Sequence, residues 1–384
     1  MRLATCIAIE ALVGAAVLTG VGVGARYGIV AAQAYVAGRH QAGPSVADPA
    51  PVAAPAVVPA AVAPIVDAAP PAADAAVDAR PGPDAATAAW PTITTVFPAD
   101  DATLLAGLAD AAVTRVTLNR GGTSLSLRLD LVGGARAAFK PQQIHWQSNP
   151  RKELAAYRLD RLLGIGRVAP VLGRSFAIDD LVAALDPSIR GLGKQRLAVE
   201  ALARGGRLAG AVSWWIPEIR GAMLRGFRID STDGVVTWRK LLRAGSQVAE
   251  RERVLLASIS TMTAFDFLID NIDRWTGGNA KVAPGSDELF FMDNTMSFTS
   301  DGNGHRKSQL YLERVQMFSR RLVGAVRALT PDALARAMAA DLGPFDEILS
   351  GDEQRALLGR RDALLVYVDQ LIASHGEAAV LGFD

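Results

Sequence analysis

The stretch FDFLIDNIDRWTGGN (residues 265–279) joins an apolar run to a polar segment that holds an acid, a guanidinium, two glycines and an amide. The run that leads into it, VLLASISTMTAFDFLID (254–270), has apolar residues at helical spacing and predicts a buried helix. Beyond it, AKV (280–282) and LFFM (289–292) predict two short strands around the turn PGSDE. The polar segment is therefore expected to be a loop held between a helix and a hairpin.

Upstream of this stretch the chain favours strands, and downstream it favours helices. The segments VTRVTLN and LSLRLDLV alternate apolar and polar residues on either side of RGGT (120–123), which is typical of a hairpin. KELAAYRLDRLLG (152–164) has apolar residues at helical spacing and ends on a glycine, so it predicts a helix. The predicted strands are 113–119, 125–132, 135–141, 168–178 and 211–219, and residues 310–381 are predicted to be mostly helical. This order predicts an α+β fold with a β-rich lobe over residues 95–217 and a helical lobe over residues 218–384.

The residues before the predicted lobes have a different composition. LATCIAIEALVGAAVLTGVGVGA (3–25) is apolar and about long enough to cross a bilayer of ~30 Å as a helix that rises ~1.5 Å per residue. Residues 1–40 are therefore expected to be a signal anchor or, with Ala32-Gln33-Ala34 as the cleavage site, a signal peptide. Residues 41–94 are rich in alanine and proline, which favours a disordered linker. We expect a membrane-anchored protein, with the side of its folded part undetermined and its export left open.

Composition excludes several classes of protein. The 40 basic and 39 acidic side chains give a formal net charge of +1, so no electrostatic footprint favours nucleic acid as a partner. Cys6 is the only cysteine, which excludes an internal disulfide and a thiolate metal cluster. The four histidines lie far apart without ligand spacing, so a zinc site is not expected.

Four polar residues stand at the ends of the predicted elements. Lys140 closes the third strand, Glu153 lies in the next helix, Asp273 ends the buried helix, and Asp293 follows LFFM. Phosphoryl transfer from ATP needs a lysine for the phosphates, a glutamate to hold the lysine, an aspartate for the acceptor hydroxyl, and oxygen ligands for a metal. The chain supplies these residue types in that order, so it predicts an ATP-dependent kinase.

Asn279 and Asp293 are the candidate ligands for Mg²⁺ or Mn²⁺. Asn279 lies six residues after Asp273, across a glycine pair that lets the backbone turn the amide toward a cation. Carboxylate and amide oxygens are the ligands that these hard cations prefer. The two residues therefore predict a metal site beside the phosphates.

The turn RGGT offers the candidate cover for the nucleotide. Gly121 and Gly122 are the residues of this turn that a phosphate could approach closely. Other nucleotide motifs are absent, because the chain has neither GxxxxGK[ST] nor a GxGxxG after a strand. It also lacks the GxSxG of hydrolases.

Three sequence blocks in this order resemble one known family. ELAAYRLDRLLGIGRVAPVLGR (153–174), FDFLIDNIDRW (265–275) and FFMDN (290–294) are similar to the helix, catalytic loop and metal motif of the four-jointed and Golgi casein kinase family of secretory-pathway kinases. WWIPEI (214–219) is also similar to four-jointed-type proteins, and the resemblance runs from about Val113 to about Phe318. The chain is identified as a bacterial-type member of this family. Membership implies a two-lobed protein-kinase-like fold.

The resemblance implies a role for each candidate residue. Lys140 would bind the nucleotide phosphates, Glu153 would pair with Lys140, Asp273 would act as the catalytic base, and Asp293 would bind the metal. Members of the family phosphorylate a serine in secreted proteins or a sugar hydroxyl. The implied partners are therefore ATP and a hydroxyl-bearing acceptor on a protein or a glycan.

The chain departs from the family pattern in three places. Trp275 stands where the family has a histidine, Asn279 differs from the metal-site spacing of related kinases, and Thr295 replaces the glycine after Asn294. A pseudokinase that binds nucleotide or a partner without turnover is therefore an alternative. A HipA-like or lipid-type kinase is the alternative family, and a purely structural envelope domain is a third hypothesis.

Overall fold

The computed structural model describes residues 93–119, 123–276 and 278–384, all of which belong to one compact unit, Arg80–Asp384. The predicted anchor or signal segment 1–40, the predicted linker up to residue 92, and the pair Gly121-Gly122 lie outside the described residues. No helix within the described ranges has the length and hydropathy of a membrane span.

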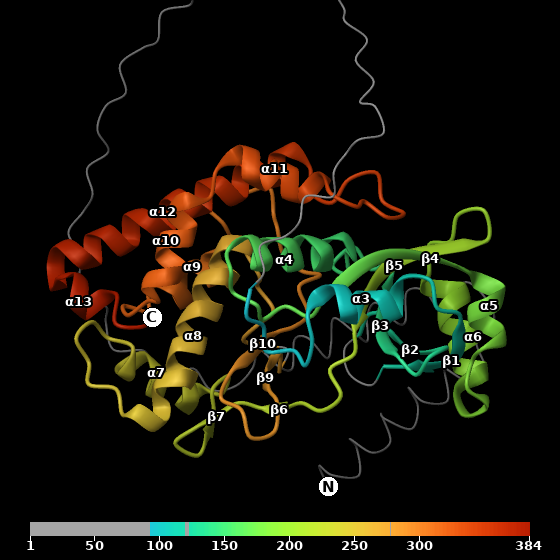
Figure 1. Cartoon of the computed structure of the whole chain (residues 1–384), viewed down its shortest axis with the longest axis horizontal. Coiled ribbons are helices and arrows are strands. Elements are labelled where there is room, and N and C mark those ends of the chain that lie inside the picture. Colours follow the sequence, from blue (N-terminus) through green and yellow to red (C-terminus); the bar gives the residue numbers. More distant parts are fainter. Residues whose placement is uncertain (1–92, 120–122, 277) are drawn as a thin grey trace, which may run out of the picture. The chain divides into compact units, whose positions relative to one another are not determined.

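The first half of this unit is built on an antiparallel sheet of five strands in the order β1-β2-β3-β5-β4 (Figure 1). Its strands are β1 (Val113–Leu118), β2 (Leu127–Leu131), β3 (Arg136–Pro141), β4 (Val171–Ala177) and β5 (Arg207–Trp214). In β2, alternate residues point into the core, where Leu127 and Leu129 are buried. The predicted hairpin and third strand are confirmed. The last predicted strand, 211–219, is displaced, because β5 begins at Arg207 and ends at Trp214.

A glycine lets β5 pass close to β3 beside Lys140. Lys140 pairs with Ala211 in the sheet, and Pro141 pairs with Gly210. A Cβ atom on Gly210 would lie 2.4 Å from the carbonyl oxygen of Lys140. A side chain there would force the two strands apart, so Gly210 fixes the backbone that carries Lys140.

Helix α4 (Arg151–Leu162) is buried on every side from Lys152 to Arg161. An amphipathic surface helix would show one polar face to water, but the charged side chains of α4 find partners inside the protein. Lys152 forms an ion pair with Glu353, and Arg158 donates to backbone carbonyl oxygens between residues 337 and 341. The helix is therefore tied to the second half of the unit by charged groups as well as by apolar packing.

The second half is mostly helical, as the sequence predicts. The long buried helix is α8 (Glu250–Ile269), which ends before the loop that carries Asp273 rather than at Asp273 itself. Asp270 caps α8 with a left-handed φ of 55°, which turns the chain out of the helix. The other helices are α7 (Thr232–Leu241), α9 (Arg306–Leu312), α10 (Arg320–Ala328), α11 (Pro331–Ala339), α12 (Gly351–His375) and α13 (Glu377–Val380). Figure 1 places α4 between the five-stranded sheet and these helices.

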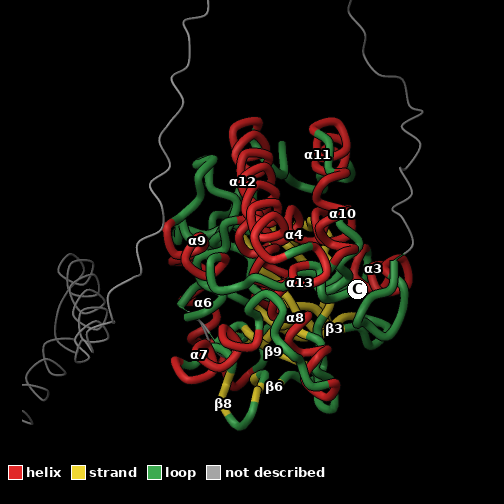
Figure 2. The backbone as a smooth tube through the Cα atoms, turned by 90° about the vertical axis from the view of Figure 1, so that its left-hand side faces the viewer, coloured by secondary structure: helices red, strands yellow, loops and turns green. Residues whose placement is uncertain are grey.

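Short strands surround the loop that follows α8. The predicted hairpin is confirmed as β9 (Ala280–Val282) and β10 (Leu289–Phe291), and β6 (Arg220–Gly221) pairs with β9. A second small hairpin is formed by β7 (Met223–Leu224) and β8 (Phe227–Arg228). Figure 2 shows β6, β8 and β9 at the opposite end from α11 and α12.

Several helices in the described part are not predicted by the sequence. Each buries few apolar side chains, so no helical period is visible: α3 buries Leu108, and α5 buries Leu181. In α6 the buried residues are Gly193 and Leu197. These unpredicted helices are α3 (Asp101–Ala109), α5 (Ile178–Ala183), the 3-10 turn η1 (Pro187–Ile189), α6 (Arg190–Glu200) and α7.

Two hydrophobic clusters underlie the two halves. One lies against the sheet and includes Leu127, Phe139 and Leu208. The other joins the helices α8 to α12 and also contains Leu154 and Leu159 of α4, so α4 shares its core with the helical half. The predicted α+β class with a β-rich and a helical lobe is confirmed. The lobe boundary at residues 217 and 218 stays a prediction.

Candidate active site

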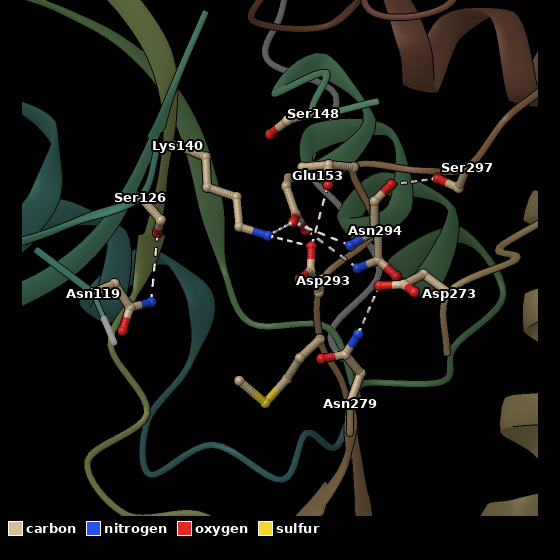
Figure 3. Close-up of polar contacts among 12 residues, drawn as sticks. Asn119, Ser126, Lys140, Ser148, Glu153, Asp273, Asn279, Asp293, Asn294 and Ser297 are labelled. Carbon is tan, nitrogen blue, oxygen red and sulfur yellow. Dashed lines mark hydrogen bonds and ion pairs between the residues drawn. The ribbon is translucent and has the colours of Figure 1, made fainter. Parts of the chain in front are cut away.

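Lys140, Glu153 and Asp293 meet in one group of side chains, called here the Lys140 cluster, although they come from β3, α4 and the segment after β10 (Figure 3). The Lys140 ammonium lies 2.5 Å from Glu153 Oε1 and 2.7 Å from Asp293 Oδ1. The side chains of Lys140 and Glu153 are largely buried, whereas that of Asp293 is 43% exposed. Asp293 is therefore the member of the cluster that a solute can reach.

Opposite charges fix the ionisation states within the Lys140 cluster. Burial alone would lower the pKa of Lys140, but attraction to the carboxylates of Asp293 and Glu153 outweighs it and raises that pKa above its ordinary value. The Lys140 ammonium in turn lowers the pKa of Asp293, against the opposing effect of burial. Near neutral pH the lysine is charged and the aspartate ionised, which are the forms that bind phosphate and metal.

Asn294 supports the Lys140 cluster from beneath. Its backbone N–H and its Nδ2 donate to the two oxygens of Glu153 at 3.1 and 3.3 Å. Its Oδ1 accepts a hydrogen bond from Arg274 Nη2 at 2.8 Å. The backbone of Asp293 lies in the left-handed region, with a φ of 56°, which aspartate tolerates. This bend aims adjacent side chains at different partners: Asp293 reaches Lys140, and Asn294 reaches Glu153.

Arg274 joins the loop 271–279 to the rest of the site from a fully buried position. It donates to both carboxylate oxygens of Asp266 on α8, at 3.0 to 3.1 Å, and to the carbonyl oxygen of Met292. Burial raises the pKa of Asp266 to about 6, although the attraction of Arg274 opposes that rise. A bidentate pair with further hydrogen bonds holds its two elements in one geometry, so Arg274 sets the position of the loop.

Asp273 is oriented by residues of its own loop. Asn279 Nδ2 donates to Asp273 Oδ2 at 3.3 Å, and Thr276 Oγ1 donates to Asp273 Oδ1 at 3.1 Å. Because a carboxylate only accepts hydrogen bonds, the nitrogen of the Asn279 amide faces Asp273 and its oxygen points away (Figure 3). Each oxygen of Asp273 keeps capacity for one more donor, such as the hydroxyl of an acceptor.

Asp293 and Asn279 are the residues that the sequence predicts as ligands for a divalent cation, and no contact joins them among the described residues. No group of three or more His, Cys, Asp or Glu side chains suited to a metal is present in the described part of the chain. Asp293 Oδ1 is engaged by Lys140 and Thr295, so Oδ2 is the oxygen that remains for a ligand. Mg²⁺ is usually bound through one or two protein carboxylates together with substrate phosphates and water. The single open oxygen of Asp293 therefore suits a cation that arrives as a metal–nucleotide complex.

Trp275 lies in the core beneath the loop rather than at the site. Its side chain is buried and stacks on Tyr311, with ring centroids 4.9 Å apart and planes 6° from parallel. It also packs against Trp238 at 5.3 Å. The structure therefore places Trp275 in aromatic packing, and the pseudokinase alternative stays open.

The structure brings the predicted site residues together in two groups. Lys140, Glu153 and Asp293 form one, and Asp273 with Asn279 forms the other, while Gly121 and Gly122 lie outside the described residues. Sequence reasoning gave no role to Arg274, Asn294 or Thr276, which hold the groups in place. Of these three residues, only Asn294 could have been found from the sequence, because it is an amide directly after the predicted metal ligand Asp293.

No protein-family model matches the chain. A glycosaminoglycan xylosylkinase of Danio rerio is 27% identical over 328 residues, which cover 73% of this chain and 77% of that protein. The Homo sapiens glycosaminoglycan xylosylkinase is 25% identical over 314 residues, which cover 71% of this chain and 76% of that protein. Among solved structures, Golgi casein kinase with Mn and ADP bound has a TM-score of 0.57 and 16% sequence identity, and the match covers 74% of this chain and 79% of the casein kinase chain. A hydra Fam20 protein with sugar has a TM-score of 0.56 and 18% sequence identity, and the match covers 76% of this chain and 95% of the Fam20 chain. The solved structures share the fold of this chain.

Proposed function

We propose that the chain, which belongs to the secretory-pathway kinase family of the four-jointed proteins and Golgi casein kinase, is an ATP-dependent phosphotransferase acting on a hydroxyl acceptor. The observation that carries the proposal is the Lys140 cluster, in which Glu153 holds an ammonium beside an accessible aspartate, Asp293. Asp273 adds an oriented carboxylate from a separate loop. Phosphoryl transfer depends on this kind of positioning and charge, more than on covalent chemistry by the protein.

Each group has a defined part in the proposed reaction. Lys140 binds the phosphates of ATP, and Glu153 keeps its ammonium in place. Asp293 and Asn279 would hold Mg²⁺ or Mn²⁺, which would neutralise phosphate charge when bound. Asp273 orients the acceptor hydroxyl and takes its proton. Arg274 keeps the loop with Asp273 in register with the segment that carries Asp293.

The acceptor we propose is a sugar hydroxyl of the xylose type. The relatives found by sequence at 27% and 25% identity are both named glycosaminoglycan xylosylkinase. The solved Golgi casein kinase, at 16% identity, is similar in fold alone. A protein hydroxyl is the alternative acceptor.

A transfer assay tests both the reaction and the acceptor. The purified full chain is incubated with γ-labelled ATP and Mn²⁺ or Mg²⁺, with a β-xyloside in one reaction and casein in another. We expect labelled xyloside, and Asp273→Asn and Asp293→Asn should each lose the label. Transfer that persists in both variants would show that the site is elsewhere. Stabilisation by ATP with neither transfer to an acceptor nor release of phosphate to water would support a pseudokinase.

The remaining residues suggest where the reaction takes place. We propose that residues 1–40 are a signal or anchor segment and that residues 41–94 are a linker between it and the kinase unit, because the first are apolar and the second are rich in alanine and proline. Protease protection in intact cells tests this: a kinase unit resistant to added protease until the membrane is opened would place it on the inner side. A chain found wholly in the soluble fraction would contradict the anchor.

A further inference from the structure

Lys307, on α9, reaches the loop that carries Asp273 from the outside. Its Nζ lies 2.5 Å from the carbonyl oxygen of Ile272 and 3.1 Å from Thr276 Oγ1. Ile272 and Thr276 stand on either side of Asp273 in sequence. Thr276 Oγ1 in turn lies 3.1 Å from Asp273 Oδ1. One side chain from a different helix thus holds both flanks of the proposed catalytic base.

Chemistry fixes the direction of this chain of hydrogen bonds. An ammonium group only donates, and an ionised carboxylate only accepts. The Thr276 hydroxyl has one hydrogen, so it must accept from Lys307 and donate to Asp273. Burial lowers the pKa of Lys307, and the negative charge of Asp273 opposes that shift.

The position of Lys307 is itself fixed by the residue that ends α8. The Asp270 carboxylate accepts hydrogen bonds from the backbone N–H of His305 and from Ser308 Oγ, both at 2.8 Å. His305 is the N-cap of α9, and Ser308 lies in its first turn, next to Lys307. Asp270 therefore places α9 against the loop, and α8, the loop and α9 form one connected unit.

We propose that Lys307 is a positioning residue for the phosphoryl transfer, acting through Thr276 to hold the Asp273 carboxylate toward the acceptor hydroxyl. The inference rests on the proposed kinase function. The other donor to Asp273, Asn279 Nδ2, is farther away, at 3.3 Å, and belongs to a residue with a second proposed role at the metal. Among the described residues, the Lys307–Thr276 pair is the tether of the Asp273 carboxylate that no proposed metal ligand shares.

The test compares four variants in the full chain with wild type. Lys307→Met keeps the apolar stem and removes the donors, and Thr276→Val keeps the shape and removes the hydroxyl. Each should lower kcat by about 10- to 100-fold with little change in the KM for ATP, because misplacement of a reacting group costs about that much. The double variant should lose no more kcat than the more impaired of the two single variants, because both substitutions break the same tether. Lys307→Arg should retain more kcat than Lys307→Met.

A matched control lies next to Lys307 on the same helix. The Arg306 side chain is exposed, and its only partners among the described residues are Gln309 in α9 and Glu313 at the end of that helix. Arg306→Gln should therefore leave kcat unchanged. Amide hydrogen exchange of residues 271–276 should quicken in Lys307→Met and not in Arg306→Gln.

The outcomes separate this inference from the proposed function. Wild type without any phosphate transfer would remove the proposed function and this inference together. An active wild type with unchanged kcat in Lys307→Met would overturn the inference alone. So would additive losses in the double variant, or a raised KM for ATP at constant kcat.

Discussion

The Lys140 cluster and the loop 271–279 carry the two halves of the proposed reaction, and they are held in different ways. In the Lys140 cluster, the ammonium lies 2.5 Å from the carboxylate of Glu153, 13 residues away in sequence, and 2.7 Å from that of Asp293, 153 residues away. In the loop, Asp273 bonds residues three and six positions away at 3.1 and 3.3 Å. Phosphates and a metal need a rigid arrangement of charges, whereas the group that meets the acceptor needs spare hydrogen-bonding capacity.

The largest expected effect would separate the two regions. Asp273→Asn removes the base but leaves the Lys140 cluster untouched, so kcat should fall by about 10³-fold, a typical loss for a general base. Stabilisation by ATP with Mn²⁺ should persist, measured as the rise in melting temperature. If the variant also loses that rise, the loop contributes to nucleotide binding and the two regions are not independent.

The second prediction concerns Asp266, which anchors Arg274 and thereby joins the two regions. Its pKa is about 6 in the folded chain against an ordinary 3.8, so the folded state binds more protons than the unfolded state between these values. The contribution of Asp266 to the free energy of unfolding should therefore fall as pH rises from about 4 to about 6. The full change is on the order of 3 kcal/mol at ~1.4 kcal/mol per pKa unit.

Chemical denaturation from pH 4 to pH 7 measures this dependence. Asp266→Asn is less stable overall, because Arg274 loses its charged partner, but its stability should lack this fall with pH. Equal slopes in the variant and in wild type would contradict the assignment.

The third prediction tests the charge balance of the Lys140 cluster. Lys140→Met removes the cation that Glu153 and Asp293 share, so kcat should fall by about 10²-fold through the loss of phosphate binding. Mn²⁺ alone should then raise the melting temperature more in the variant than in wild type, because the cation replaces a missing positive charge. The exposed Lys194 supplies the control, and Lys194→Met should behave as wild type. An equal effect of Mn²⁺ on all three proteins would argue against a metal at Asp293.

The smallest expected effect concerns Trp275. Its Nε1 is buried without a hydrogen-bond partner in the described residues, and its ring packs in the core. Trp275→His, which introduces the residue that the family resemblance implies at this position, should lower stability by about 1–3 kcal/mol while kcat changes little. Trp275→Phe should cost less, because it removes the unpaired donor and keeps an aromatic ring. A gain in kcat in Trp275→His would contradict the expectation that Trp275 acts only in packing.

Strong patterns made much of the fold predictable. The alternation in residues 125–132 and the apolar period of residues 254–270 were sufficient for β2 and α8, because each buries a long, regular set of side chains. The helices α3, α5, α6 and α7 were not predicted, since their few buried residues leave no period to read. The N-terminal segments carry predictions that the described residues do not reach.

The candidate site was predictable in its residue types and only partly in its contacts. The order of Lys140, Glu153, Asp273 and Asp293 indicated the chemistry. The contacts of Arg274 and Lys307 were invisible, because arginine and lysine are usually solvated and the partners of these two lie on other elements. The orientation of Trp275 was invisible for the same reason: the sequence places it beside Asp273, but only packing shows that it points into the core.

The sequence alone determined local elements of this protein, including the apolar run that forms α8 and the hairpin of β9 and β10 after the loop. The tertiary structure decided that Lys140 meets Asp293 across 153 residues and that α4 is buried on all sides. Local contacts follow from backbone dihedrals and short spacing. Distant ones form only when core packing offsets the entropy of closing the chain, and that balance cannot be read from a spacing.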